Sequence, residues 1–264
     1  MAITHLKPES YPTWKEYYWT YQNKLAELHY LPLFEAWGVP MTGKKVLDVG
    51  CGDGGFTAAL AEAGAISTGV EIRDFGWEKT HANLRFIQQD ILADDAQSIL
   101  GDDYDIIILR DVIEHISLER KHEFMTALRK FTSSKGIILM TFPPFYSPFG
   151  LHQQTFLKSL FKKLPYLGWI PGSFLDILLK LLGESDKARA DVKEIRECRM
   201  TIRRFKKIVK ELNYSITNEK YYLIRPSHEL RYGWKLRESR LARIPILREI
   251  FILGSVFKLS IGQE

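Results

Sequence analysis

The chain has 264 residues, of which 45% are hydrophobic and 26% charged, as expected for one large globular domain or for one domain with an insertion. The net charge of +5 permits an anionic partner without requiring one. Two cysteines exclude a disulfide framework and predict a reducing, cytoplasmic location. Residues 1–12 do not resemble a signal peptide, and the longest apolar run, 164–175, is too short to span a bilayer.

The first 142 residues alternate between strand and helix patterns. An aromatic-rich segment, 11–37, has the spacing of a helix and precedes the first strand. Strands are predicted over 45–49, 66–72, 83–89, 104–109 and 136–142, with helices over 54–63 and 117–131. Ser117 is the predicted cap of the second of these helices. This alternation predicts an α/β fold with a doubly wound, mostly parallel, seven-stranded sheet.

After Phe142 the alternation stops at two consecutive prolines. Apolar helical pieces over 156–164 and 174–182, separated by glycines and prolines, predict an insertion. A helix over 202–212 and strands over 214–224 and 250–261 then close the sheet. The chain therefore divides into an N-terminal helical extension (1–40), a ligand-binding core (41–144), a helical cap (145–198) and a C-terminal segment with the closing strands (199–264).

The first predicted strand leads into a glycine-rich loop, VLDVGCGDGG, at residues 46–55. Gly50, Gly52 and Gly55 fit the dinucleotide pattern G-x-G-x-x-G, which on its own is weakly specific. However, Asp48 and Asp53 flank the loop, and carboxylates at contact range repel a pyrophosphate. A ligand that carries positive charge converts this repulsion into attraction. S-adenosylmethionine has a sulfonium and an ammonium group and no phosphate.

The same stretch resembles the first motif of the class I S-adenosylmethionine (SAM)-dependent methyltransferases, an acid followed by x-Gly-x-Gly-x-Gly. Asp48, Gly50, Gly52 and Gly54 match it position for position. The resemblance is to the small-molecule, type 11/12-like branch, and it covers residues 40–142 well and the last two strands loosely. It implies a Rossmann-like methyltransferase fold, SAM as cofactor and S-adenosylhomocysteine as product. It points to no metal ligand.

Further residues match the family pattern in order. Glu71 ends the second strand, where an acid accepts both ribose hydroxyls. Asp90 would take the adenine amino group, with Ile91 beside the base, and Arg110 and Asp111 would line the methionine end. Each acid alone fits a strand end or a turn, and only their order and spacing favour the site. The predicted cofactor residues are Asp48, Gly50, Cys51, Gly52, Glu71, Ile72, Asp90, Ile91, Arg110 and Asp111.

Catalytic candidates lie on loops at the carboxyl ends of the strands, where open α/β sheets bind ligands. His115 follows the fourth strand, and Tyr146 and His152 follow the fifth. Each is a candidate base or substrate ligand, with a packing or surface role as the alternative. The run at 143–145 resembles the Pro-Pro-Tyr/Phe signature of amino-group methyltransferases. It follows the wrong strand, however, and lacks the preceding amide or acid.

The apolar cap is the main indication of the substrate. Its leucines and aromatics predict a lid over an apolar or aromatic small molecule, a dimer contact, or a membrane-facing surface with lysines toward the headgroups. The basic segment 199–207 keeps an RNA or protein methyltransferase as an alternative, although a solvated helix face is favoured over nucleic-acid binding. A NAD-linked oxidoreductase and a non-catalytic SAM-binding module are the alternatives from other classes.

Overall fold

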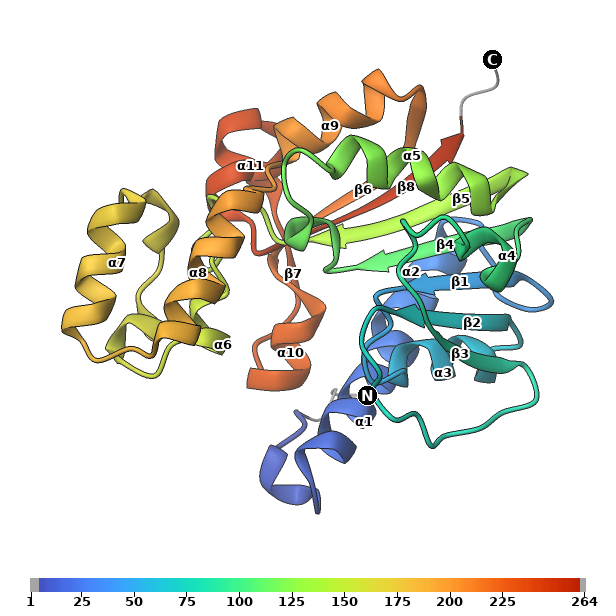
Figure 1. Cartoon of the computed structure of the whole chain (residues 1–264), viewed down its shortest axis with the longest axis horizontal. Coiled ribbons are helices and arrows are strands. Elements are labelled where there is room, and N and C mark those ends of the chain that lie inside the picture. Colours follow the sequence, from blue (N-terminus) through green and yellow to red (C-terminus); the bar gives the residue numbers. More distant parts are fainter. Residues whose placement is uncertain (1–4, 262–264) are drawn as a thin grey trace.

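The computed structural model describes residues 5–261, so the outermost residues of the predicted terminal segments, 1–4 and 262–264, lie outside it. One sheet runs through the molecule in the strand order β3-β2-β1-β4-β5-β8-β6-β7 (Figure 1). The strands are β1 (Lys45–Val49), β2 (Ile66–Glu71), β3 (Leu84–Gln88), β4 (Tyr104–Arg110), β5 (Thr132–Phe142), β6 (Tyr214–Ile224), β7 (Arg237–Glu238) and β8 (Gly254–Ile261). The first five pair in parallel, and β8 is antiparallel to β5 and β6.

The helices cover both faces of this sheet, as the doubly wound prediction requires. Figure 1 shows α5 and α9 over one face, and α1 and α3 over the other. The helices are α1 (Trp14–Leu25), α2 (Leu31–Ala36), α3 (Gly55–Glu62), α4 (Ala96–Leu100), α5 (Lys121–Phe131), α6 (Gln153–Phe156), α7 (Gly172–Leu181), α8 (Asp186–Cys198), α9 (Ile202–Glu211), α10 (Pro226–Tyr232) and α11 (Pro245–Phe251). Within residues 5–261, none of these helices has the length and apolar character needed to cross a membrane.

The apolar run of β4 explains why two cores form. Ile107 and Leu109 belong to the cluster on the α5 and α9 face, whereas Ile106 and Ile108 belong to the cluster on the α1 and α3 face. Successive side chains of a strand point to opposite faces, so a central strand buried on both sides must be apolar at every position. The expected fold class is confirmed, and the two-residue strand β7 extends the seven long strands at one edge.

The segment 145–198 forms a cap with an apolar cluster of its own (Figure 1). That cluster includes Leu157, Leu167, Leu175 and Leu179. Ser185 caps α8 by accepting a hydrogen bond from the Ala188 amide. Part of the predicted apolar surface is thus buried within the cap itself, while Leu160, Phe174, Ile177 and Leu181 remain exposed.

Several element predictions were wrong in detail. Residues 156–164 are not one helix, because the Glu184 carboxylate accepts the amides of Lys158 and Ser159 and holds this segment open. Helix α5 begins at Lys121, so Ser117 does not cap it. The last strand begins at Gly254, because Pro245 starts the helix α11 before it. The predicted strands 66–72 and 83–89 are slightly longer than the observed strands β2 and β3. Helices α4, α6, α8, α10 and α11 were not predicted.

A buried lysine fixes the turn that leaves β4. Lys121, at the start of α5, is fully buried, and its ammonium donates hydrogen bonds to the carbonyls of Ile113 and Ile116. Burial lowers the pKa of Lys121 to about 8. The turn 113–115 therefore depends on a side chain that lies a few residues further along the chain.

We predict that Lys121→Met destabilises the protein by about 2 kcal/mol or more, because two buried carbonyls lose a charge-assisted donor. Urea unfolding followed by circular dichroism measures the change. Lys130→Met, at an exposed position of the same helix, is the matched control and should leave the free energy of unfolding nearly unchanged. Equal stability of the two variants would contradict the role assigned to Lys121.

Candidate active site

The glycine loop lies between β1 and α3 and is open to a ligand on one side only. Gly50 and Gly52 have left-handed backbone angles, with φ of +74° and +53°. A Cβ at Gly50 would lie 2.5 Å from Val112 Cγ2, and one at Gly54 would lie 2.3 Å from Phe86 Cζ. A Cβ at Gly52 would meet no described atom within 4 Å. Bare backbone is therefore accessible at Gly52, where a ligand can approach closely.

Asp48 lies behind this loop rather than on its surface. Its side chain is buried, and its carboxylate accepts a hydrogen bond of 2.6 Å from the Thr57 hydroxyl in α3. Burial raises the pKa of Asp48 to about 6, against the opposing effects of Thr57 and Arg110. The buried neighbour Cys51 also has a raised pKa, from burial first and from Asp48 second. Asp48 thus joins β1 to α3 and places a titratable negative charge beneath the loop.

Glu71, at the end of β2, lies on the open side of the loop. Its carboxylate accepts the amides of Gly52, at 3.3 Å, and of Ile72, at 3.0 Å. The Ile72 side chain is 62% exposed. The sequence analysis missed Trp77, whose indole N–H donates to the Gly52 carbonyl at 2.8 Å and whose ring stacks on Phe86. Its segment has no periodic pattern that could have indicated this contact.

The two residues that were predicted to bind adenine after β3 lie in different environments. Asp90 is half-buried, and its carboxylate accepts the Leu92 amide at 2.9 Å, so it forms the turn that its residue type favours. Ile91 is buried in the core cluster on the α5 face. Ile72, not Ile91, therefore provides the exposed apolar surface at this edge of the sheet.

Arg110 and Asp111, which end β4, point in different directions. The Arg110 guanidinium lies over the Phe56 ring, 4.8 Å from its centroid. Asp111 has φ of +57° and forms a partly buried ion pair with Arg225, which precedes α10. Burial favours the neutral acid, but Arg225 and Arg110 outweigh it and lower the pKa of Asp111 to about 2. Arg225 lies 114 residues away in sequence, so no local pattern could have indicated this pair.

The structure brings two of the three catalytic candidates together. The rings of His115 and His152 have centroids 5.4 Å apart. Glu114 joins them, and one ligand atom of each residue lies within 4.8 Å of the others. Among the described residues, neither carboxylate oxygen of Glu114 has a hydrogen-bond partner, and the same holds for His152 Nε2. Sequence reasoning missed Glu114 because an acid in a loop usually faces solvent.

Burial sets the protonation states in this Glu114–His115–His152 cluster. Desolvation lowers the pKa of the half-buried His152 to about 3 and also lowers that of His115, although His115 retains an exposed surface, so both imidazoles are neutral at pH 7. Burial, with Asp111 adding to it, raises the pKa of Glu114. Neutral imidazoles can accept a proton, and two imidazoles with one carboxylate are also a ligand set for a divalent transition-metal ion.

The third candidate, Tyr146, lies elsewhere in the loop after β5. Its ring packs on Phe145 and Trp169, with centroids 5.0 Å and 5.4 Å away. It lines a cavity that none of the glycine-loop residues 50–54 lines. Tyr146 is therefore not part of the Glu114–His115–His152 cluster, and the catalytic roles of all three candidates stay predictions.

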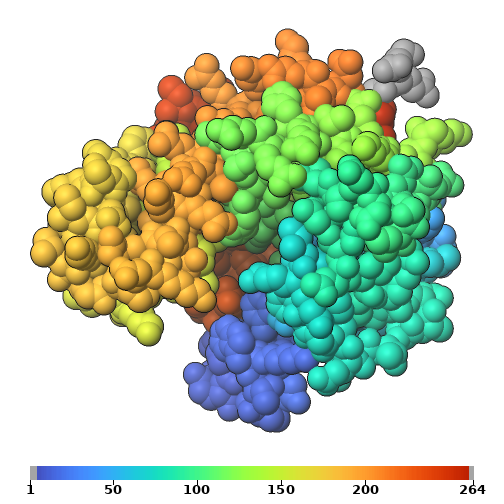
Figure 2. Space-filling view, viewed as in Figure 1, coloured from blue at the N-terminus to red at the C-terminus, as the bar shows by residue number. Residues whose placement is uncertain are grey.

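Several segments surround a hollow on one face of the molecule. Figure 2 shows this hollow between the cap, the N-terminal helical segment and the chain after β2. Helix α8 of the cap contacts the turn 113–115, and Arg231 of α10 lies over the rings of Tyr18 and Tyr21 in α1. The aromatic N-terminal helix and the cap thus form walls around the carboxyl ends of β1 and β4.

Comparison with known proteins agrees with this geometry. A family model described as a methyltransferase domain matches residues 18–218, which is most of the chain. A ubiquinone biosynthesis O-methyltransferase of Rhizobium leguminosarum bv. trifolii is 28% identical over 136 residues, 50% of this chain and 51% of that protein. The enzyme of the same name from Coxiella burnetii is 40% identical over 87 residues, 30% of this chain and 35% of that protein.

A solved structure shows the same fold. A SAM-dependent methyltransferase from Archaeoglobus fulgidus superposes with a TM-score of 0.52 at 16% identity, over 92% of this chain and 99% of that one. The chain belongs to the methyltransferase-domain family, a family that uses SAM as methyl donor. The family and the fold expected from the glycine loop are therefore confirmed. The chain spans about half the length of the curated relatives it matches.

We predict that Mn²⁺ binds at the Glu114–His115–His152 cluster and that His152→Ala weakens this binding by about tenfold or more, because it removes one ligand. Electron paramagnetic resonance of free Mn²⁺ during titration measures the affinity. His122→Ala is the control, since His122 is exposed and pairs with Glu211 on the outside of α5. Unchanged Mn²⁺ affinity in His152→Ala would contradict a cation site at this cluster.

Proposed function

We propose that this chain is a SAM-dependent methyltransferase that methylates a small acceptor, with an oxygen atom as the methyl acceptor. The observation that carries the proposal is the glycine loop, open only at Gly52 and bordered by Glu71 on its surface and Asp48 beneath it. The O-methyltransferases among the relatives support the choice of oxygen. The activity and acceptor of the whole protein remain proposals, because those relatives match over only half their length.

The residues around the loop fit SAM. Glu71 lies where an acid can accept two ribose hydroxyls, and the backbone at Gly52 permits close contact beside it. Ile72 offers an exposed apolar surface, and Asp90 a carboxylate, at the edge where the base would lie. Negative charge around the loop favours a cationic ligand over a diphosphate. This arrangement, together with the family, argues against the NAD-linked alternative.

The chain's own residues orient the acceptor and accept its proton. SAM supplies a methyl group that its sulfonium already activates, so positioning and exclusion of water are the main tasks of the protein. In the transfer, the acceptor oxygen forms a bond to the methyl carbon as the carbon–sulfur bond breaks. When no metal ion occupies the cluster, the hydroxyl proton passes to one of its neutral imidazoles, His152 or His115; Glu114 lies 3.9 Å from His152 Nε2.

The walls of the hollow support a small acceptor. The cap, with α8 against the turn 113–115, and the aromatic helix α1 border the hollow of Figure 2. A lid is the role of the cap that this placement supports best, while the exposed apolar side chains of α7 keep a dimer or membrane contact as predictions. The cytoplasmic location also stays a prediction, and both cysteines are free and buried.

We predict that Gly52→Ala weakens SAM binding by about tenfold or more, because the added methyl group occupies the open side of the loop. Isothermal titration calorimetry measures the affinity. Gly43→Ala is the matched control: Gly43 also has a left-handed φ, +73°, and open space around its Cβ position, but it lies in an exposed turn before β1. Both variants should lose about 1 kcal/mol of stability from the left-handed backbone. Equal SAM affinity in the two variants would refute this placement of the cofactor.

We predict that SAM affinity decreases as the pH falls from 7 to 5. Burial raises the pKa of Asp48 to about 6, so the carboxylate is charged above this pH and neutral below it. Protonation removes a negative charge beneath a loop that binds a cation, and affinity must therefore fall on the acid side. Calorimetry across this range should show the decrease in the native protein and a flatter profile in Asp48→Asn. An identical pH profile in both proteins would show that another group titrates.

A further inference from the structure

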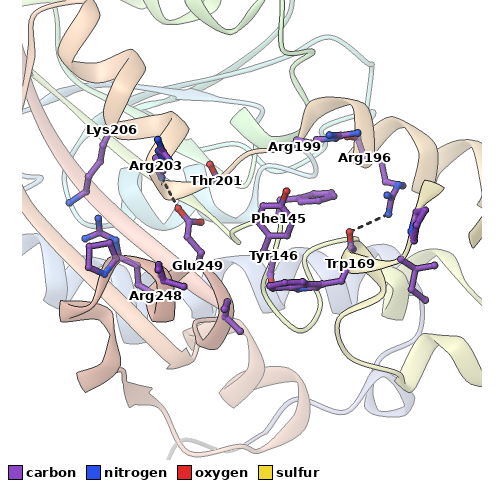
Figure 3. A pocket seen from close by; sticks show the side chains of 16 residues that line it. Phe145, Tyr146, Trp169, Arg196, Arg199, Thr201, Arg203, Lys206, Arg248 and Glu249 are labelled. Atoms are coloured by element: carbon purple, nitrogen blue, oxygen red, sulfur yellow. Dashed lines mark hydrogen bonds between the residues drawn. The ribbon is translucent and has the colours of Figure 1, made fainter.

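A second cavity lies between the cap and the C-terminal helices, away from the glycine loop (Figure 3). Its volume is about 870 Å³. The turn 167–169 of the cap, the end of α8 and the beginnings of α9 and α11 surround it, together with Phe145 and Tyr146 from the loop after β5. None of the proposed cofactor residues lines it. The methyl-transfer site therefore does not account for this cavity.

Arginines dominate the polar lining of the cavity. Arg196 and Arg199 come from the end of α8, Arg203 from α9, and Arg248 from α11. In the part of the chain that the structure describes, none of these four guanidinium groups forms an ion pair with a carboxylate. A fifth cation, Lys206, does pair with Glu219. The cavity therefore carries uncompensated positive charge.

The one acidic residue in the lining does not neutralise these arginines. The Glu249 carboxylate accepts the amides of Ile202, at 3.1 Å, and Arg203, at 2.7 Å, at the start of α9 (Figure 3). Its charge is thus directed at the first turn of a helix, where backbone N–H groups lack partners of their own. The guanidinium groups across the cavity remain without a counter-ion.

Two of the arginines lack good hydrogen-bond partners. Arg248 Nε is buried and has no hydrogen-bond partner within residues 5–261. The Arg196 side chain donates one long hydrogen bond, 3.4 Å, to the Gly168 carbonyl, and burial together with the charge of Arg199 lowers its pKa. Like charges held in a partly buried space repel one another. An anion between them would relieve the repulsion and accept charge-assisted hydrogen bonds.

The remaining walls are apolar and aromatic. Phe145, Tyr146 and Trp169 form one side, and the Arg196 guanidinium lies 6.0 Å from the centre of the Phe145 ring. Ile246, which begins the opposite rim on α11, is 71% exposed. A simple inorganic anion would leave this surface uncovered. The cavity matches a ligand in which an anionic group adjoins an apolar one.

We propose that this cavity binds a phosphate group attached to an apolar moiety. The phosphate would lie among Arg196, Arg199, Arg203 and Arg248, since guanidinium groups bind phosphate oxygens in bidentate fashion. The apolar part would contact Trp169 and Ile246. The headgroup of an anionic membrane lipid and a soluble phosphorylated molecule share this chemistry. The proposal does not depend on methyl transfer, because the cavity and the glycine loop have no lining residue in common.

The test compares two double variants that remove the same charge. Arg196→Gln/Arg203→Gln removes two cavity cations, one from α8 and one from α9. Lys193→Gln/Lys207→Gln removes two exposed cations outside the cavity from the same two helices. The probes are inorganic pyrophosphate, followed by calorimetry, and phosphatidylcholine vesicles with and without phosphatidylglycerol, followed by sedimentation. SAM affinity and thermal unfolding of each protein show that it has folded.

The cavity variant should bind at least one probe about tenfold or more weakly than the native protein, and the control pair should bind it normally. If the cavity variant loses binding of pyrophosphate alone, the ligand is a soluble phosphorylated molecule. If it loses binding of phosphatidylglycerol vesicles alone, the ligand is a lipid headgroup. Binding of neither probe by the native protein, or equal loss in both variants, would overturn the proposal. Tight binding of single-stranded RNA that both variants weaken equally would also overturn it. If the double variant fails to fold, Arg203→Gln alone, at an exposed position, serves in its place.

Discussion

The site depends on one constraint, the left-handed backbone of the loop between β1 and α3. Two of its glycines are in contact with neighbouring elements, Gly50 against Val112 and Gly54 against Phe86, so that no side chain can be added at either position. These contacts leave Gly52 as the accessible position. The surrounding packing has already fixed this backbone, so a ligand that contacts it at Gly52 binds at little cost in flexibility.

Around this loop the fold brings together charged groups from distant parts of the chain, most of them only partly buried. Asp111 meets Arg225 across the carboxyl ends of the central strands, and the Glu114–His115–His152 cluster lies against the cap. A buried ion pair contributes little net stability once desolvation is counted, but removing one partner is costly. The pair therefore fixes geometry: it joins the end of β4 to the start of α10, next to the proposed acceptor site.

The cap has two sides with different chemistry. Toward the sheet, α8 closes on the turn that carries Glu114 and His115. On the side toward α9 and α11, the cap and the C-terminal helices enclose the arginine cavity. The loop after β5 is common to both, because His152 belongs to the cluster and Tyr146 to the cavity. A ligand in the cavity would thus contact the same loop that supplies a catalytic candidate.

The sequence by itself determined the sheet, its doubly wound topology and the glycine loop, because strand and helix periodicity and an ordered motif are local properties of the chain. It also placed Glu71 at the end of the second strand and the two histidines after the fourth and fifth strands, as the structure has them. Only the tertiary structure decided which of these side chains meet. Asp111 pairs with Arg225, and Glu114 lies beside His152, which are contacts between segments far apart in sequence. Tyr146 lies on the same loop as His152 but lines a different cavity. No pattern within a single segment encodes such contacts, since they arise from the packing of the cap and the closing strands against the core.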